Sequence, residues 1–140
     1  MATVRREREE DFGAIREAVF NGLKAYNEAK VGPRNTRPLA LCLRGEDGTI
    51  LGGLVGEFKW DWLHVDMLWI DQTQRGKGHG EALVNMAEDE ARKRGAIGIY
   101  LHTGSRQAPG FYARLGYREC GHMENYPVVG SSLHHFAKAL

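Results

Sequence analysis

The glycine-rich stretch QRGKGHG, residues 74–80, contains the residue types in this chain that are best suited to binding chemistry. It follows the apolar run LHVDMLWI and precedes EALVNMAEDEARKRG, whose apolar spacing predicts a helix. A helix N-terminus has unpaired backbone N–H groups and a partial positive charge, and glycines let an anion approach that backbone closely. Arg75 and Lys77 add side-chain charge. The stretch therefore predicts a site for a phosphate or a pyrophosphate.

Two common phosphate-binding motifs do not match this turn. A Walker P-loop needs GK[ST] after its glycines, and that sequence does not follow here. The dinucleotide-binding pattern GxGxxG fails on spacing, because these glycines are spaced GxGxG. The alternative is that the stretch binds no ligand and is an ordinary glycine-rich connection between a strand and a helix. Three glycines and two basic residues in so short a connection favour the binding site.

The elements that must position this turn follow from the spacing of apolar residues. A β-turn-α-β unit around the glycines should place its two strands parallel, through a right-handed crossover, and the earlier strands read as antiparallel. This succession indicates an α/β or α+β fold. The expected strands are residues 3–8, 39–44, 49–58, 62–70, 96–101, 117–123 and 133–140. The expected helices are residues 10–29, the stretch after the glycines with the apolar stripe Leu83, Met86, Ala87 and Ala91, and a short helix beginning near Pro109.

The whole chain has 140 residues, a formal net charge of +1 and two cysteines. This length suits one globular domain, expected to span residues 1–140. Because acids and bases nearly cancel, neither nucleic acid nor a membrane surface is indicated as a partner. The charged N-terminus, the lack of a long apolar run and the low cysteine count lead us to expect a soluble cytoplasmic protein. The histidines are scattered along the sequence, so no metal site is expected.

Several residues from Trp62 to about His122 stand in an order and at separations known from one protein family. They are Leu68 and Ile70, the run Arg75-Gly76-Lys77-Gly78-His79-Gly80, the pattern AExEAxxxG ending at Gly95, and Gln107-Ala108, Phe111-Tyr112 and Gly116-Tyr117. The run resembles the Q/R-x-x-G-x-G/A signature of the GNAT superfamily of acyl-CoA N-acetyltransferases, here as a small stand-alone bacterial-type member. The resemblance implies a mixed, mostly antiparallel sheet of six to seven strands flanked by about four helices. Its central parallel unit would splay to hold acyl-CoA.

The resemblance also implies acetyl-CoA as co-substrate. The backbone N–H groups of the turn would cradle its pyrophosphate, and its pantetheine arm would pair with the strand before the turn, as a peptide does at a sheet edge. His102 and Ser105 follow the next strand, where the family often carries an asparagine or aspartate that contacts the arm. This sequence departs from that pattern at His102, and capping the short helix is the simpler role of Ser105. The cofactor-binding residues expected on this basis are Leu68, Trp69, Ile70, Arg75, Gly76, Lys77, Gly78, His79, Gly80 and Ser105.

Acetyl transfer to an amine needs a neutral nucleophile, a stabilised oxyanion and protonation of the departing thiolate. The family's acid position falls on Tyr112, and Phe111 beside it is expected in the core. A CoA thiol has a pKa near that of free cysteine, roughly 8.5, so the acid need supply only a modest factor.

His64 is the first candidate for the base that accepts the amine proton. Period-two alternation places it on one strand face with Asp66, Leu68 and Ile70, and several family members carry a histidine or glutamate at this point. Its unperturbed pKa of about 6.5 suits a base near neutral pH. A half-buried histidine bonded to a neighbouring strand fits the pattern equally well. Glu57, at the end of the preceding strand, is a second candidate.

The amine acceptor is expected beside aromatic and acidic residues, which suit a cation. The predicted substrate-binding residues are Tyr26, Trp60, Trp62 and Asp66. A small amine, an amino acid, an antibiotic or a peptide amine would fit, so a protein lysine or N-terminal acetyltransferase stays an alternative. A non-catalytic acyl-CoA-binding or regulatory module and a plain phosphate binder are two others. A homodimer is compatible with each of them.

Overall fold

The computed structural model of the chain describes residues 1–105 and 107–140. These residues form two compact units, Met1–Arg34 and Asn35–Leu140, and each is described by itself. The single domain expected over residues 1–140 stays a prediction. Among the described residues, no helix is both long and apolar enough to span a membrane.

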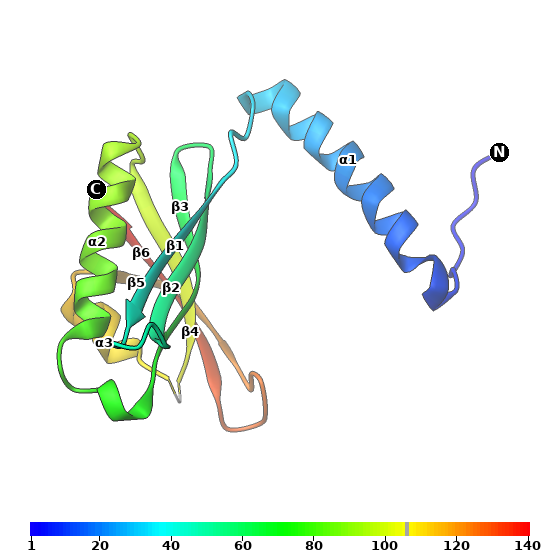
Figure 1. Cartoon of the computed structure of the whole chain (residues 1–140). Coiled ribbons are helices and arrows are strands. Elements are labelled where there is room, and N and C mark those ends of the chain that lie inside the picture. The colour runs from blue at the N-terminus through cyan, green and yellow to red at the C-terminus, as the bar shows by residue number, and fades with distance from the viewer. Residues whose placement is uncertain (106) are drawn as a thin grey trace. The chain divides into compact units, whose positions relative to one another are not determined.

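The Met1–Arg34 unit is one long helix preceded by a short turn. A 3-10 turn at Glu9–Asp11 leads into α1, Phe12–Val31, which confirms the expected helix and continues through Gly22 without a break. The strand expected at residues 3–8 is wrong, because these residues form no strand (Figure 1). Four of these six residues are charged, so the segment lacks the alternating apolar side chains that a strand face would bury.

The Asn35–Leu140 unit is built on one six-stranded sheet with the order β1-β2-β3-β4-β6-β5 (Figure 1). Within the described residues only β3 and β4 pair in parallel, which confirms the expected mixed, mostly antiparallel sheet. The described residues of both units together contain three α-helices and two short 3-10 turns, where about four helices were expected; α2, α3 and one of the 3-10 turns belong to this unit. The strands are β1 Arg37–Arg44, β2 Ile50–Lys59, β3 Trp62–Ile70, β4 Gly98–Gly104, β5 Arg118–Glu124 and β6 Ser132–Ala139.

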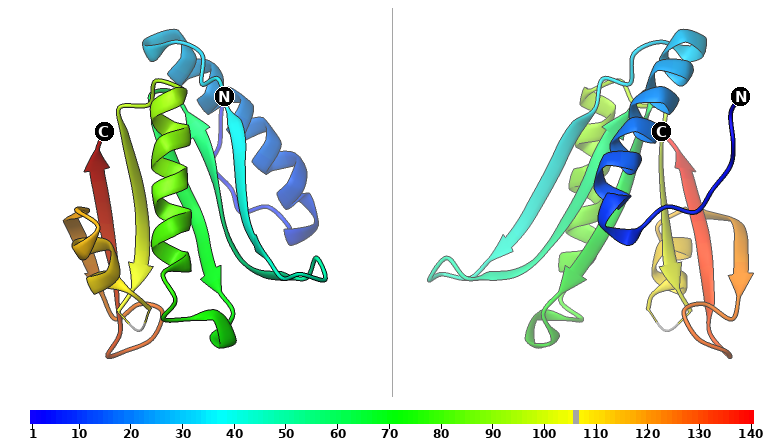
Figure 2. Two further views of the ribbon diagram at one scale, coloured as in Figure 1. Left: turned by 60° about the vertical axis from the view of Figure 1, so that its left-hand side comes forward. Right: turned by 90° about the vertical axis from the view of Figure 1, so that its right-hand side faces the viewer.

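Two helices cover the same face of this sheet, α2 at His79–Lys93 and α3 at Pro109–Arg114 (Figure 2). The apolar stripe predicted for α2 is largely confirmed, except that Met86 is 53% exposed and Val84 is buried instead. Burial of this stripe against the sheet supplies most of the helix's stability, since isolated helices of this length are marginal in water. The core side chains contributed by α2 are Leu83, Val84, Ala87 and Ala91.

A β-bulge at Asp66 interrupts the pairing of β3 with β2. Val65 pairs with Gly56 and Met67 pairs with Val55, so Asp66 has no partner residue on β2. Because successive side chains of a strand point to opposite faces, one extra residue reverses the alternation of every side chain beyond it.

The bulge overturns the expectation that His64 shares a strand face with Asp66, Leu68 and Ile70. Beyond the bulge Leu68 and Ile70 pack against the core beneath α2. His64 precedes the bulge, next to the fully buried Leu63, and lies on the other face of the sheet, which we call the open face. The side chains beyond the bulge on the open face are Met67 and Trp69, which are 62% and 51% exposed.

Strands β3 and β4 separate after a short parallel contact, as the left view of Figure 2 shows. They pair only from Trp62 with Gly98 to His64 with Tyr100, although β3 continues to Ile70. In the described part of the chain, no strand pairs with this edge of β3 beyond His64. Backbone groups along that edge can therefore pair with an extended ligand.

Candidate functional site

The glycine turn has a backbone conformation that only glycine adopts readily. Gly76 and Gly78 have φ angles of +74° and +84°, in the left-handed region. A Cβ atom added at either position would meet no atom within 4 Å, so the backbone there faces open space. Gly78 is the N-cap of α2, and no side chain caps the helix. The first N–H groups of α2 are thus left for an anion.

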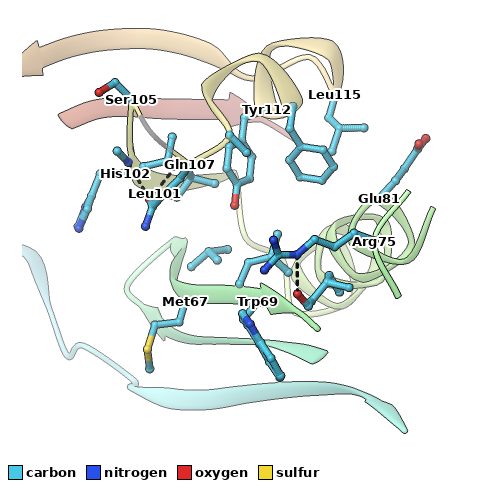
Figure 3. A pocket seen from close by; sticks show the side chains of 18 of the residues that line it. Met67, Trp69, Arg75, Glu81, Leu101, His102, Ser105, Gln107, Tyr112 and Leu115 are labelled. Carbon is cyan, nitrogen blue, oxygen red and sulfur yellow. Dashed lines mark hydrogen bonds between the residues drawn. The ribbon is translucent and has the colours of Figure 1, made fainter. Parts of the chain in front are cut away.

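The two basic side chains of the turn differ in where they lie. Arg75 Nε donates to the backbone oxygen of Ile70 at 3.0 Å, which ties the end of β3 to the turn (Figure 3). Lys77 Nζ donates to Gln74 Oε1 at 3.3 Å. Arg75 lines the pocket described next and Lys77 does not. A cofactor contact by Lys77 therefore remains a prediction that this arrangement does not favour.

A pocket extends from the glycine turn, along the separated part of β3 and β4, to α3. It brings together most of the predicted site, including the predicted acid Tyr112 and the bulge residue Asp66. The predicted cofactor-binding residues that line it are Leu68, Trp69, Ile70, Arg75, Gly76, Gly78, His79, Gly80 and Ser105. These residues come from one strand, the glycine turn, the start of α2 and the loop after β4, which only the fold places side by side.

The Tyr112 hydroxyl points into the pocket from α3, although the residue is only 6% exposed (Figure 3). Burial raises its pKa to about 12, so the phenol keeps its proton at neutral pH and can donate it in a hydrogen bond. Phe111 was expected in the core, with Tyr112 on a neighbouring face. Phe111 does pack against the core, partly buried, but Tyr112 is itself a buried member of the core. The Phe111 ring lies close to Gly80, where an added Cβ would approach it to 3.3 Å.

His64 lies on the open face beside the pocket, without lining it. Its ring stacks on Tyr100 with ring centres 4.6 Å apart, and the ring of His102 lies 6.0 Å away. Burial lowers the pKa of His64 below its usual 6.5, with a further decrease from Lys59, while Asp66 and Glu57 act in the opposite direction. His64 is therefore neutral at pH 7, the form that a base requires.

Glu57, the second candidate base, is the cross-strand neighbour of His64. The two residues pair directly in the β2–β3 register, which places both side chains on the open face, and Glu57 does not line the pocket either. His102 does line it and stands between two other histidines, since its ring is also 5.7 Å from that of His135. The open face thus has a row of ionisable groups beside the pocket.

Of the predicted substrate-binding residues, only Asp66 lines the pocket. Trp60 lies in the turn between β2 and β3 with a φ angle of +51°. The Trp62 ring covers Gly98, where an added Cβ would come within 2.3 Å of it, so packing is the role that its contacts support. Tyr26 is part of α1 in the Met1–Arg34 unit, and its predicted role stays a prediction.

A small hydrogen-bond network shapes the loop between β4 and α3. Gln107 Oε1 accepts from Thr103 Oγ1 at 3.0 Å and from the backbone N–H of Gly104 at 2.7 Å. Ser105 Oγ accepts from the backbone N–H of Ser132 at 2.9 Å. Ser105 therefore does not cap α3, whose N-cap is Ala108. The sequence signal for the contact with Thr103 was a glutamine four residues after a threonine. That spacing is too common in proteins to predict a hydrogen bond by itself.

No group of three or more histidine, cysteine or acidic side chains in residues 1–105 and 107–140 is arranged to hold a metal ion. Both cysteines are exposed and free, and neither lines the pocket.

Comparison with known proteins gives one consistent result. Residues 2–117 match the family described as "Acetyltransferase (GNAT) family". Blasticidin-S acetyltransferase of Streptomyces morookaense is 47% identical over 97 residues, which cover 69% of this chain and 71% of that protein. The crystal structure of an acetyltransferase from Bacillus cereus is 32% identical, with a TM-score of 0.86 over 99% of this chain and 98% of that one.

A more distant structure, from Bacillus anthracis, was solved in complex with acetyl coenzyme A. It is 20% identical, with a TM-score of 0.59 over 66% of this chain and 57% of that chain. At this identity the likeness concerns the fold alone.

Proposed function

The chain belongs to the GNAT family of acetyltransferases, and from this membership we propose that it transfers the acetyl group of acetyl-CoA to a primary amine of a small molecule. The observation that carries the proposal is that the glycine turn, the separated edge of β3 and the Tyr112 hydroxyl border one pocket. A pyrophosphate, an amide-containing arm and a thioester sulfur are the three parts of acetyl-CoA that these features suit, in that order along the pocket.

In the proposed reaction both substrates are bound together. The amine lone pair attacks the thioester carbonyl carbon, the C–N bond forms and the C–S bond breaks. The amine proton passes to a base and the thiolate leaves as CoA. No cysteine of the described residues lines the pocket, which supports direct attack over an acyl-cysteine intermediate.

Tyr112 assists the departing sulfur in this proposal. Its pKa of about 12 lies above the roughly 8.5 of a free thiol. Full proton transfer to the thiolate is therefore unfavourable, and the hydroxyl acts by donating a hydrogen bond to the negative charge that develops on sulfur. Such a contact is stronger in the transition state than with the neutral thioester, so it contributes to the rate rather than to binding.

His64 accepts the amine proton, directly or through water, and Glu57 beside it assists. The lowered pKa of His64 keeps the imidazole neutral, and the two carboxylates near it, Glu57 and Asp66, favour the imidazolium as it forms. His64 does not line the pocket itself, so a bound water between the amine and the imidazole fits the arrangement.

A small-molecule acceptor is favoured over a peptide by the relatives. The 47% identical relative bears the name of blasticidin S, and a 35% identical relative over 55% of this chain bears that of streptothricin. The acceptor would approach from the open face, where Trp69 is 51% exposed beside the bulge at Asp66. An aromatic and acidic surface of this kind attracts a cationic amine.

Thiol release from acetyl-CoA, measured against a panel of amines, tests the proposal. The panel contains blasticidin S, streptothricin, a lysine-containing peptide and a simple alkylamine. We expect turnover above the no-amine rate with at least one small molecule, and intersecting initial-velocity lines when both substrates are varied. Turnover with the peptide alone would make the chain a protein acetyltransferase. Binding of acetyl-CoA without turnover on a broad panel would favour a non-catalytic module, and parallel lines would exclude direct attack.

A further inference from the structure

An ion pair between a buried carboxylate and a lysine whose side chain is 25% exposed joins α2 to β6 beside the pocket, without lining it. Glu88 of α2 is only 4% exposed, and its Oε1 lies 2.5 Å from Nζ of Lys138 in β6. The Tyr117 hydroxyl lies 3.5 Å from the same oxygen. Desolvation of two charges offsets most of their attraction, so a buried pair is weak support for stability alone. Its remaining contacts indicate another role.

The ion pair also contacts the C-terminal end of α3. Lys138 Nζ donates to the backbone oxygen of Leu115 at 2.9 Å, and Leu115 is the C-cap of that helix. A cation there satisfies a carbonyl that the helix leaves unpaired and complements the helix dipole. The backbone N–H of Tyr117 closes the same turn by donating to the Tyr112 oxygen at 3.0 Å. Lys138 thus holds the turn that follows Tyr112.

We propose that Lys138, held in place by its contact with Glu88, is a positioning residue that fixes the Tyr112 hydroxyl relative to the glycine turn. The proposal deepens the proposed function and rests on the role given there to Tyr112. Helix α3 has only six residues, too few to be rigid by its own hydrogen bonds. Leu115 directly follows α3, and its backbone N–H donates to the Tyr112 oxygen at 3.1 Å, so an anchor at Leu115 restrains Tyr112 (Figure 3).

The geometry couples two parts of the pocket that bind different ends of acetyl-CoA. Glu88 lies on α2, the same helix that begins at the glycine turn. The path from the turn to Tyr112 therefore consists of one regular helix, the contact of Glu88 with Lys138 and the contact of Lys138 with Leu115. If the last contact is lost, the hydroxyl is free to shift relative to a sulfur that the turn still positions.

The test uses a double variant that removes the charges together. Glu88→Leu with Lys138→Met replaces the pair by apolar side chains, which avoids leaving one buried charge alone and usually preserves the fold. The Leu115 oxygen then lacks its cation. The matched control is Glu90→Leu with Lys93→Met, which makes the same substitutions in a pair on the same helix whose Lys93 side chain is 73% exposed. Thermal melting with and without acetyl-CoA checks that each variant folds and binds.

Each double variant is made in the wild-type and in the Tyr112→Phe background, and kcat and the KM for acetyl-CoA are measured for all of them. We expect the Glu88/Lys138 variant to lower kcat by about tenfold in the wild-type background, because small displacements of a reacting group are costly. We expect no further decrease in the Tyr112→Phe background and a KM within about twofold of its parent. Lys138→Arg, which keeps a donor and a charge, should retain more of kcat than Lys138→Met.

Three results would overturn the proposal. The first is an equal loss of kcat in both backgrounds, which would mean that the pair supports the fold in general. The second is an unchanged kcat in the Glu88/Lys138 variant. The third is a wild-type kcat in Tyr112→Phe, which would refute both the role of Tyr112 and the proposal that Lys138 positions it. Turnover of the unmodified protein on the amine panel would still support acetyl transfer in that case.

Discussion

At the scale of single residues, Tyr112 and His64 have pKa values displaced in opposite directions by their surroundings. Burial raises the pKa of Tyr112 to about 12 and keeps the phenol protonated. Burial and the nearby Lys59 lower the pKa of His64 and keep the imidazole neutral. One group is held as a donor and the other as an acceptor, the pattern by which acid and base roles are assigned.

The pH dependence of kcat/KM follows from the direction of the His64 shift. The imidazole must be neutral to accept a proton, and its pKa in the folded protein lies below 6.5, so its contribution is lost as the pH falls through a value below 6.5. We expect an acidic limb in that range. His64→Ala should remove it or move it toward the pKa of the amine. His122→Ala, which alters an exposed histidine on β5, is the control, and an unchanged limb in His64→Ala would transfer the role to Glu57 or to water.

Replacement of Tyr112 by phenylalanine should slow the reaction without abolishing it. We expect kcat to fall by roughly tenfold to a hundredfold, because a thiolate is already a fair leaving group and only one donor is removed. Acetyl-CoA affinity by calorimetry should stay close to wild type. A wild-type kcat in Tyr112→Phe would mean that the thiolate leaves unassisted.

At the scale of elements, three local irregularities border the pocket. The glycine turn begins α2 without a side-chain cap. The bulge at Asp66 reverses the alternation of side chains along β3, so that Leu68 and Ile70 pack against the core. The early separation of β3 from β4 leaves an unpaired strand edge between these two features. In regular elements the backbone groups at these three places would be hydrogen-bonded within the protein and would not be open to a ligand.

The substitution Gly78→Glu tests the turn as an element. A glutamate there places a carboxylate where an anion should bind and forces a side chain into a φ of +84°, at a cost of about 1 kcal/mol in the free energy of unfolding. We expect acetyl-CoA binding to fail by calorimetry while the protein stays folded. Gly48→Glu is the matched control, because Gly48 also has a φ of +84° and open space at its Cβ position. Equal acetyl-CoA affinity in both variants would show that the turn is only structural.

At the scale of the whole molecule, ligand binding should appear as stabilisation. Acetyl-CoA at about 100 times its Kd should raise the melting temperature by roughly 10 °C, and a pantetheine derivative without phosphates should raise it far less. The physical reason is that, in the proposed complex, the pyrophosphate binds at the N-terminus of α2, which belongs to the unit that holds the sheet. Equal shifts from both ligands would contradict the site assigned to the turn, and an equal shift from ATP would favour a plain phosphate binder.

The sequence by itself determined the features that depend on neighbouring residues. The glycines after an apolar strand, the acidic start and basic end of α2, and Pro109 at the start of α3 are local signals, and each element formed where they indicated. The parallel unit around the turn followed from the order of those elements. Family resemblance added Tyr112, which lines the pocket as expected.

Only the tertiary structure decided the features that depend on register and on contacts distant in sequence. The bulge at Asp66 appears only when β3 is aligned with β2, since a strict alternation in the sequence contains no sign of an extra residue. The ion pair joins Glu88 and Lys138, which are far apart in the chain. The residues next to each of them in the sequence do not distinguish it from a charged residue exposed to solvent. Packing of the whole sheet against α2 and α3 selects these contacts, because burial rewards the arrangement that satisfies all side chains together.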